Sequence, residues 1–173
     1  GSIPATLFLM DRLVIVFLFG NFLTGQIPTE IGKLSLCRHL DLSNNGLSGS
    51  LPTQINQLTS LEELHLDRNQ LTGHLPTPFL STLHLKKINL FSNDIAGTIP
   101  VDLFSRPFLE QVDVSDNQFT GSLPTNFASS TVLETLRVGA NPGIGGTLPT
   151  QLGLCTALIE FDCNDCGLKG AIP

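Results

Sequence analysis

A phrase of thirteen residues recurs along this chain at an almost constant interval. It reads LDLSNNGLSGSLP from Leu40 to Pro52 and LHLDRNQLTGHLP from Leu64 to Pro76. The closing proline recurs at Pro4, Pro28, Pro52, Pro76, Pro100, Pro124, Pro149 and Pro173, which is a period of 24 residues with one step of 25. A fixed period of this length predicts an array of stacked units, in which each unit buries the apolar side chains of its neighbours.

The first part of each unit has the pattern LxxLxLxxNxL, seen as LEELHLDRNQL from Leu61 to Leu71. Its alternation of apolar and polar residues has the period of a strand with one buried face. Because such segments return once per unit, their strands can stack in parallel with a return segment behind each. We expect one parallel sheet of seven short strands, with short helical turns or irregular chain in the return segments. The expected strand centres are Phe17, Asp41, His65, Asn89, Asp113, Arg137 and Asp162.

The asparagine of each unit follows the strand and is expected to hold the turn. Its side chain can accept and donate hydrogen bonds, so a column of asparagines would satisfy buried peptide groups of successive units. Cys166 takes this position in the last unit. The glycine of each TG or SG pair suits a turn with a backbone angle that other residues disfavour, and the proline after it suits a position that donates no ladder bond. These repeated positions encode the scaffold. Only the x positions of the pattern are therefore free to encode function.

The pattern LxxLxLxxNxL, followed by TGQIPTEIGKL from Thr24 to Leu34, resembles the leucine-rich repeat family and its plant-type subfamily over the whole chain. The resemblance implies an α/β solenoid, right-handed and curved, with the sheet on the concave face and helical turns on the convex face. It also implies a module that binds a protein or peptide on the concave face, as in receptor-kinase ectodomains and secreted receptor-like proteins, without a cofactor. Inhibition of secreted enzymes is a further role of proteins that resemble this type.

A single domain, 1–173, is expected because no shift in composition divides the chain. The sequence begins in register, stops in mid-unit and has no cysteine-bearing cap, so we expect part of a longer solenoid that is truncated at both ends. Gly1 and Ser2 fit the register as native residues, with a cloning remnant as the alternative. The resemblance implies an extracellular or cell-surface protein, although the chain has no N-x-S/T glycosylation site.

Charge and hydropathy argue against two classes of partner. The net charge of −6 and the pI of about 5.0 argue against nucleic acid, which is bound through basic surfaces. The most apolar stretch, LVIVFLFG from Leu13 to Gly20, is far shorter than the ~20 residues that span a bilayer, and it fits the register as a strand. We therefore predict no membrane span in this chain.

The four cysteines are expected to be structural. The register places Cys37, Cys155 and Cys163 at inward apolar positions and Cys166 in the asparagine column, so we predict four free thiols. A bridge between Cys163 and Cys166, which form a C-x-x-C pair, is the alternative. No metal site is predicted, because zinc would need a second pair of ligands.

Catalysis is not expected from this sequence. His39 and His65 are the histidines at outward positions of the strands, which are adjacent. His39 and Asp41 could be drawn as a base with the carboxylate that orients it, but residues two apart in a strand merely share a face. No nucleophile is placed beside them.

Candidate ligand-binding residues lie at the two ends of the sheet. The first strand exposes apolar side chains where its neighbour has polar ones, and an exposed apolar patch marks an interface with a partner or with chain lying upstream. Incomplete covering at a non-ideal end repeat is the alternative. The residues of this patch are Val14, Ile15, Phe17 and Phe19.

The charges on the middle strands alternate from Arg38 to Glu62 to Lys86, which predicts a ladder of surface ion pairs. The last three strands carry an excess of acidic side chains. Their candidate ligand-binding residues are Glu110, Asp116, Glu134, Arg137, Asp162 and Asp165.

At this acidic end, Asp113 and Asp162 flank Arg137 and are expected to pair with it. Glu110 and Glu134 are neighbours of like sign, which costs stability unless a ligand relieves it. Such a ligand would be a basic peptide or protein surface, and a plain solvated acidic rim is the alternative.

A column of threonines raises a second functional class, adsorption to a surface such as ice. Regularly spaced threonines can match a lattice, although Ala5 and Val101 interrupt this column. Its members are Thr29, Thr53, Thr77, Thr125 and Thr150.

Overall fold

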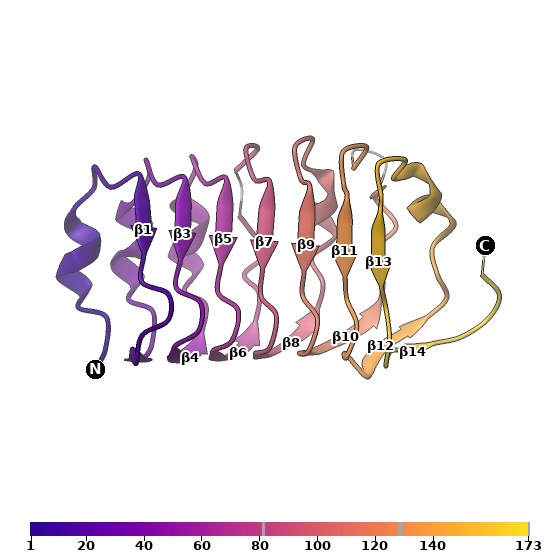
Figure 1. Ribbon diagram of the computed structural model, residues 1–173, viewed down its shortest axis with the longest axis horizontal. Coiled ribbons are helices and arrows are strands. Elements are labelled where there is room, and N and C mark those ends of the chain that lie inside the picture. Colours follow the sequence, from indigo (N-terminus) through magenta and orange to yellow (C-terminus); the bar gives the residue numbers. More distant parts are fainter. Residues whose placement is uncertain (81, 128–129, 173) are drawn as a thin grey trace.

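The structure of the protein is a computed structural model that describes residues 1–80, 82–127 and 130–172. The chain winds once per repeat, so that successive strands lie side by side along the molecule (Figure 1). The first sheet has seven parallel strands in chain order, which confirms the predicted stacking. Its strands are β1 (Ile15–Phe17), β3 (His39–Asp41), β5 (Glu63–His65), β7 (Lys87–Asn89), β9 (Gln111–Asp113), β11 (Thr135–Arg137) and β13 (Glu160–Asp162).

Each strand of the first sheet turns its middle residue into the core and its two flanking residues outward. In β5, Leu64 is buried, whereas Glu63 and His65 are half-buried on the outer side. The predicted strand centres lie one residue too late, because each is the last residue of its strand. At the end of β3 the Asp41 side chain accepts a hydrogen bond of 2.9 Å from the backbone N–H of Ser43, which ties the strand to the turn that follows it.

A second parallel sheet of seven strands forms another wall of the solenoid, so the expectation of one sheet is wrong. Its strands are β2 (Thr24–Gly25), β4 (Gly46–Ser50), β6 (Gln70–His74), β8 (Asp94–Thr98), β10 (Gln118–Ser122), β12 (Gly143–Gly146) and β14 (Gly167–Leu168). The unusual backbone angle expected of the glycines is confirmed, since φ is 76° at Gly49 and 85° at Gly97. These glycines lie inside β4 and β8 rather than in turns, which is why the sequence pattern hides the second sheet.

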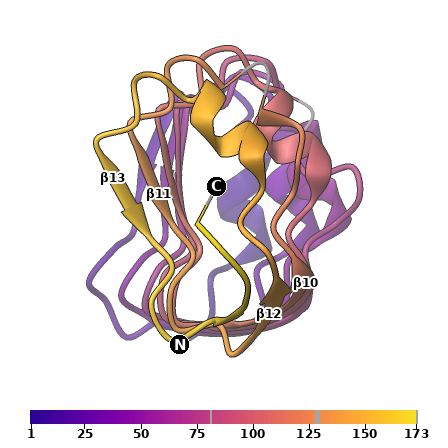
Figure 2. The ribbon, with the colours of Figure 1, turned by 90° about the vertical axis from the view of Figure 1, so that its right-hand side faces the viewer.

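Short 3-10 helices lie in the return segments, as predicted. They are η1 (Ala5–Leu9), η2 (Thr29–Lys33), η3 (Thr53–Gln57), η4 (Val101–Ser105) and η6 (Thr150–Leu154). Figure 2, which looks along the solenoid, shows the two sheets and the helices surrounding one interior. That interior is a continuous core of Leu, Ile, Val and Phe side chains.

The return segment from 76 to 86 is irregular in its described part, and a buried arginine holds it. The Arg106 guanidinium donates hydrogen bonds to the backbone carbonyl oxygens of Phe79 and Leu80. From the preceding unit, the Asn56 side chain accepts a hydrogen bond of 2.7 Å from the Leu80 N–H. Polar side chains of two neighbouring units thus replace the helical turn in satisfying this backbone.

The asparagine column forms as predicted and links consecutive units. The Asn117 side-chain oxygen accepts a hydrogen bond of 3.0 Å from the Ile95 N–H of the unit before. Its side-chain nitrogen donates to the carbonyl oxygens of Leu90, at 2.9 Å, and of Val114 and Ser115 in its own unit. The same pattern recurs at Asn45, Asn69, Asn93 and Asn141.

The cysteines are free thiols, as predicted. Cys166 continues the column, because its sulfur donates to the Val138 carbonyl oxygen at 3.4 Å. That carbonyl lies 28 residues back, instead of the 27 spanned by the asparagines, because NPGIGG adds a residue after Asn141. Cys37 is buried, and burial raises the pKa of its thiol to about 11.

The column generates a stability prediction. Asn117→Ala should lower the free energy of unfolding by about 3 kcal/mol, because it leaves the buried Ile95 N–H and several carbonyl oxygens without partners. Urea denaturation followed by circular dichroism measures the loss. Asn21→Ala is the matched control, because the Asn21 side chain is exposed and bonds to its own unit. Equal losses in the two variants would show that the column does not hold the units together.

Candidate functional site

The outward side chains of the first sheet form one continuous surface, which we call the outer face. It carries the first and third residues of each strand, the residue before the strand and the outward residues of the turn that follows. Near its middle, Glu62 lies 3.4 Å from Arg38 and 2.9 Å from Lys86, which confirms the predicted charge ladder. The hydrogen bond from Lys86 holds the pKa of the Glu62 carboxyl below its usual value.

A second cluster on the outer face surrounds Glu63. Its carboxylate oxygens lie 3.3 Å from the Lys87 ammonium, 3.4 Å from His39 Nδ1 and 3.7 Å from His65 Nε2. Partial burial acts to raise the pKa of Glu63, but Lys87 and His39 outweigh it and leave that pKa below its usual value. Cations and carboxylates on three adjacent strands are therefore paired with one another.

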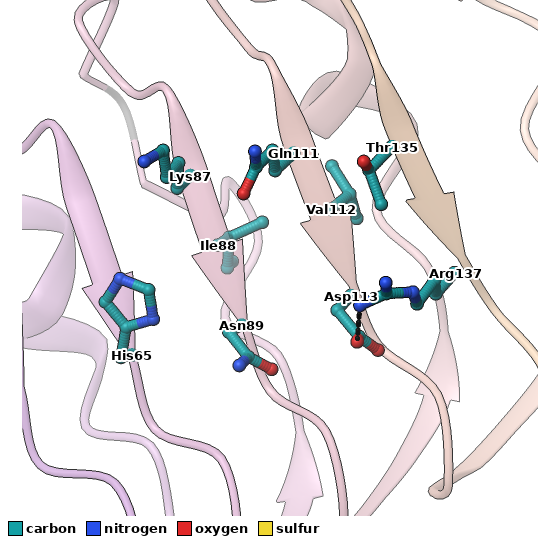
Figure 3. A pocket seen from close by; sticks show the side chains of 9 residues that line it. All are labelled: His65, Lys87, Ile88, Asn89, Gln111, Val112, Asp113, Thr135 and Arg137. Carbon is teal, nitrogen blue, oxygen red and sulfur yellow. Dashed lines mark hydrogen bonds and ion pairs between the residues drawn. The ribbon is translucent and has the colours of Figure 1, made fainter. Parts of the chain in front are cut away.

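A small hollow crosses the face from β5 to β11. Figure 3 shows side chains of four neighbouring strands around it, with Arg137 and Asp113 joined across β11 and β9. Its residues are His65, Lys87, Ile88, Asn89, Gln111, Val112, Asp113, Thr135 and Arg137. Polar groups from successive strands thus line one hollow, where they can contact several side chains of one ligand.

Arg137 is held by two carboxylates beside this hollow. Its Nε and Nη2 donate to the two oxygens of Glu160 at 2.7 Å and 2.8 Å, and its Nη1 donates to Asp113 at 3.3 Å. The hydrogen bonds from Arg137 lower the pKa of Glu160. The guanidinium is therefore fixed in orientation by a bidentate pair.

The sequence prediction for Arg137 is half right. Asp113 and Asp162 do flank Arg137 in register on β9 and β13, and the pair with Asp113 forms. The second partner is Glu160 instead of Asp162, because the long glutamate side chain at the start of β13 meets both nitrogens of the guanidinium edge. The Asp162 carboxylate instead accepts a hydrogen bond from the Asn164 N–H, as Asp41 does from Ser43.

The candidate residues of the first strand gather at one end of the outer face. Val14, Ile15, Phe17 and Phe19 are all exposed, and Phe17 has 59% of its surface accessible. The Phe17 and Phe19 rings meet edge to face with centroids 6.2 Å apart. The structure therefore brings the predicted patch together.

The acidic candidates gather at the other end. Glu134 lies directly beside Glu110, because the Glu134 N–H donates to the Glu110 carbonyl oxygen at 2.8 Å. Asp116 and Asp165 follow β9 and β13 on either side of Ala140. In the described part of the chain, Glu134, Asp116, Asp162 and Asp165 take part in no ion pair.

Several residues of the outer face were not singled out from the sequence. Glu63 and three polar residues of the hollow, Lys87, Gln111 and Thr135, were missed, although their outward positions in the repeat were available as a signal. The Arg68 guanidinium lies 5.7 Å from the centre of the Phe91 ring, one unit further on. Position in the repeat gives the direction of a side chain, but not which neighbour it meets.

The considered pairing of His39 with Asp41 does not form. His39 faces Glu63, whereas the Asp41 carboxylate accepts hydrogen bonds from the N–H and hydroxyl of Ser43. Over the described residues, no cluster of three or more His, Cys, Asp or Glu side chains is arranged to hold a metal ion. The same residues contain no helix with the length and apolar character needed to cross a membrane.

Comparisons with known proteins agree with this architecture. The family model described as Leucine Rich Repeat matches residues 37–58, 60–81 and 108–130. No curated protein matches the sequence significantly.

Solved structures match over most of the chain. The plant peptide hormone receptor RGFR1 in complex with RGF2 is 32% identical over 100% of this chain and 28% of its own, with a TM-score of 0.96. Pollen Receptor Kinase 3 is 30% identical over 91% of this chain and 76% of its own, with a TM-score of 0.80. A plant ice-binding protein is 27% identical over 100% of this chain and 63% of its own, with a TM-score of 0.74. The chain thus spans less than a third of the peptide hormone receptor.

The arginine pair generates a prediction on pH. Because Arg137 lowers the pKa of Glu160 in the folded protein, the pair stabilises the fold above the usual value of 4.5 and loses its effect as the pH falls through the lowered value. Arg137→Gln should raise the pKa of Glu160 toward 4.5, as measured by carbon-13 NMR titration of its carboxyl. Arg38→Gln should leave this titration unchanged, because Arg38 contacts Glu62. A Glu160 titration that is the same in wild type and Arg137→Gln would refute the assignment.

Proposed function

We propose, from the premise that this chain belongs to the leucine-rich repeat family, that it is a recognition module which binds a peptide or protein on the outer face of its first sheet. The module takes part in signalling as a section of a longer receptor or receptor-like protein, in an extracellular or cell-surface setting. It acts by binding and not by catalysis.

One observation carries the proposal. Along the first sheet the buried residues repeat with little change, whereas the outward residues differ from strand to strand in charge, size and polarity. Scaffold positions are thus uniform, and the varied positions share one exposed surface that a ligand can cover in a single extended pose. The similarity to the receptor RGFR1, whose structure contains RGF2, supports a peptide as the class of ligand.

Selection from a peptide library tests this function. The immobilised protein is screened against random peptides about ten residues long, enough to cross the sheet in an extended form. We expect enriched peptides to lose binding to Gln111→Trp, because Gln111 is exposed on β9 and lines the hollow. Gln151→Trp is the matched control, because Gln151 is exposed on η6, away from this face. Peptides that respond equally to the two changes would place binding elsewhere.

Adsorption to ice is the second candidate function, and the second sheet favours it. Beside the threonine column runs a row of exposed outward residues at Gln26, Ser50, His74, Thr98, Ser122 and Thr147, most of them hydroxyl-bearing. The similarity to a plant ice-binding protein supports the same reading. Thermal hysteresis that Thr98→Tyr reduces and Gln111→Trp leaves unchanged would favour this function. We expect the hysteresis to be at most weak, because Gln26, His74 and Val101 interrupt the rows.

A further inference from the structure

We propose that the outer face binds one extended peptide through two anchors, an apolar side chain over β1 and a basic side chain over β11, about seven residues apart. This inference rests on the proposed function and names the chemistry of its ligand. The apolar patch supplies one anchor, and the charge of the opposite end identifies the other.

The apolar patch is a feature of the outer face and not of the end of the array. Ile15 pairs in register with His39, and Phe17 with Asp41, so the patch residues stand where other strands present polar side chains. Leu13 and Leu18 are different, because they occupy inward positions that pack against the core. A further unit stacked beside β1 would cover such inward side chains, whereas Ile15 and Phe17 would still point away from the core.

Two aromatic rings make this patch a suitable pocket wall. Phe17 and Phe19 are 59% and 55% exposed, and their edge-to-face contact fixes one ring against the other. Val14, which precedes β1, and Ile15 within it extend the apolar surface. An aromatic or branched aliphatic side chain would bury area on all four without displacing any buried polar group.

The opposite end of the outer face carries the net charge of the whole protein. Seven carboxylates and one guanidinium, that of Arg137, lie on and around β9, β11 and β13, which gives a net charge of −6. The carboxylates are those of Glu110, Asp113, Asp116, Glu134, Glu160, Asp162 and Asp165. The chain as a whole also has a net charge of −6, from 15 acidic and 9 basic residues. The remaining eight acidic and eight basic residues balance in number, so the net charge of the protein lies at this end of the face, where it would attract a basic ligand.

Ion pairs with Arg137 neutralise part of that charge, and Glu134 is not one of the partners. Arg137 binds Asp113 and Glu160, as described above. Glu134 is exposed, stands beside Glu110 and forms no ion pair within the described residues. A basic side chain placed between Glu134 and Glu110 would relieve the repulsion between them.

The spacing of the two anchors follows from the sheet. β1 and β11 are separated by five strand-to-strand steps in the order of the sheet. At about 4.8 Å per step this is roughly 24 Å, and an extended peptide advances about 3.3 Å per residue, so the anchors lie about seven residues apart. Between them the ligand crosses the ion-paired middle and the hollow of Figure 3, where neutral polar side chains fit best.

The same library of random peptides tests the inference when it is screened against two outer-face variants. Wild type should enrich peptides that carry an aromatic or aliphatic residue and a Lys or Arg about seven positions apart. Peptides enriched on Glu134→Lys should carry Asp or Glu in place of the basic residue and should keep the apolar residue. Phe17→Ser should remove the preference for the apolar residue and retain the basic one. Asp94→Lys and Phe22→Ser are the matched controls, because both positions are exposed off this face, on and beside the second sheet, and should leave both preferences unchanged.

A selected peptide then provides a quantitative test. Changing its basic residue to Glu should weaken binding to wild type about tenfold or more and restore binding to Glu134→Lys. Binding of the original peptide should weaken as salt rises, mainly through slower association.

The outcomes separate this inference from the function beneath it. Peptides that bind the outer face without the two-anchor pattern would overturn the inference and leave the proposed function standing. Failure to select any peptide sensitive to Gln111→Trp would overturn both. If sedimentation shows that Phe17→Ser turns a self-associated wild type into a monomer, the patch joins two copies of this chain and the two-anchor peptide is ruled out.

Discussion

The architecture depends on one hydrogen-bonding device, the amide side chain that closes each unit. A carboxamide has an acceptor and two donor hydrogens, and in this chain they reach the backbone of the unit before as well as the turn of its own unit. Two three-residue strands offer few ladder bonds to each other. The side chain at Asn117 and its equivalents adds several more and holds the turn that follows each strand. The exposed x positions can then vary, because the apolar core and the asparagine column occupy other positions of the repeat.

Much of this scaffold could be predicted from the sequence, because its determinants are local and repeated. The alternation in LHL predicts a strand, the period of 24 predicts parallel stacking, and the role of Cys166 follows from its place in the column. The second sheet could not be predicted in this way. Gly49 and Gly97 adopt positive φ inside β4 and β8, and glycine with proline is the ordinary signal of a turn. Extended chain there is imposed by the neighbouring units and not by local preference.

The outer face shows where prediction from register ends. Register correctly places Phe17 beside Asp41 and Arg137 between Asp113 and Asp162. It cannot tell which carboxylate a long guanidinium side chain will choose, since that depends on reach and rotamer. The pairing of Arg137 with Glu160 and the contacts of Glu63 with side chains of three strands are therefore results of the structure. A ligand would be recognised by these outward side chains, whose directions follow from the sequence but whose contacts do not.

The added residue after Asn141 is absorbed in a turn. Thr135 and Glu160 still pair in register across it, and the column resumes at Cys166 with a slightly longer reach. A chain that tolerates such a change without disturbing the adjacent strands can also gain or lose whole windings, since each winding docks on its neighbours alone. Duplication or deletion within the gene would then change the length of the surface in increments of one strand spacing, about 4.8 Å, while leaving the composition of every other winding intact.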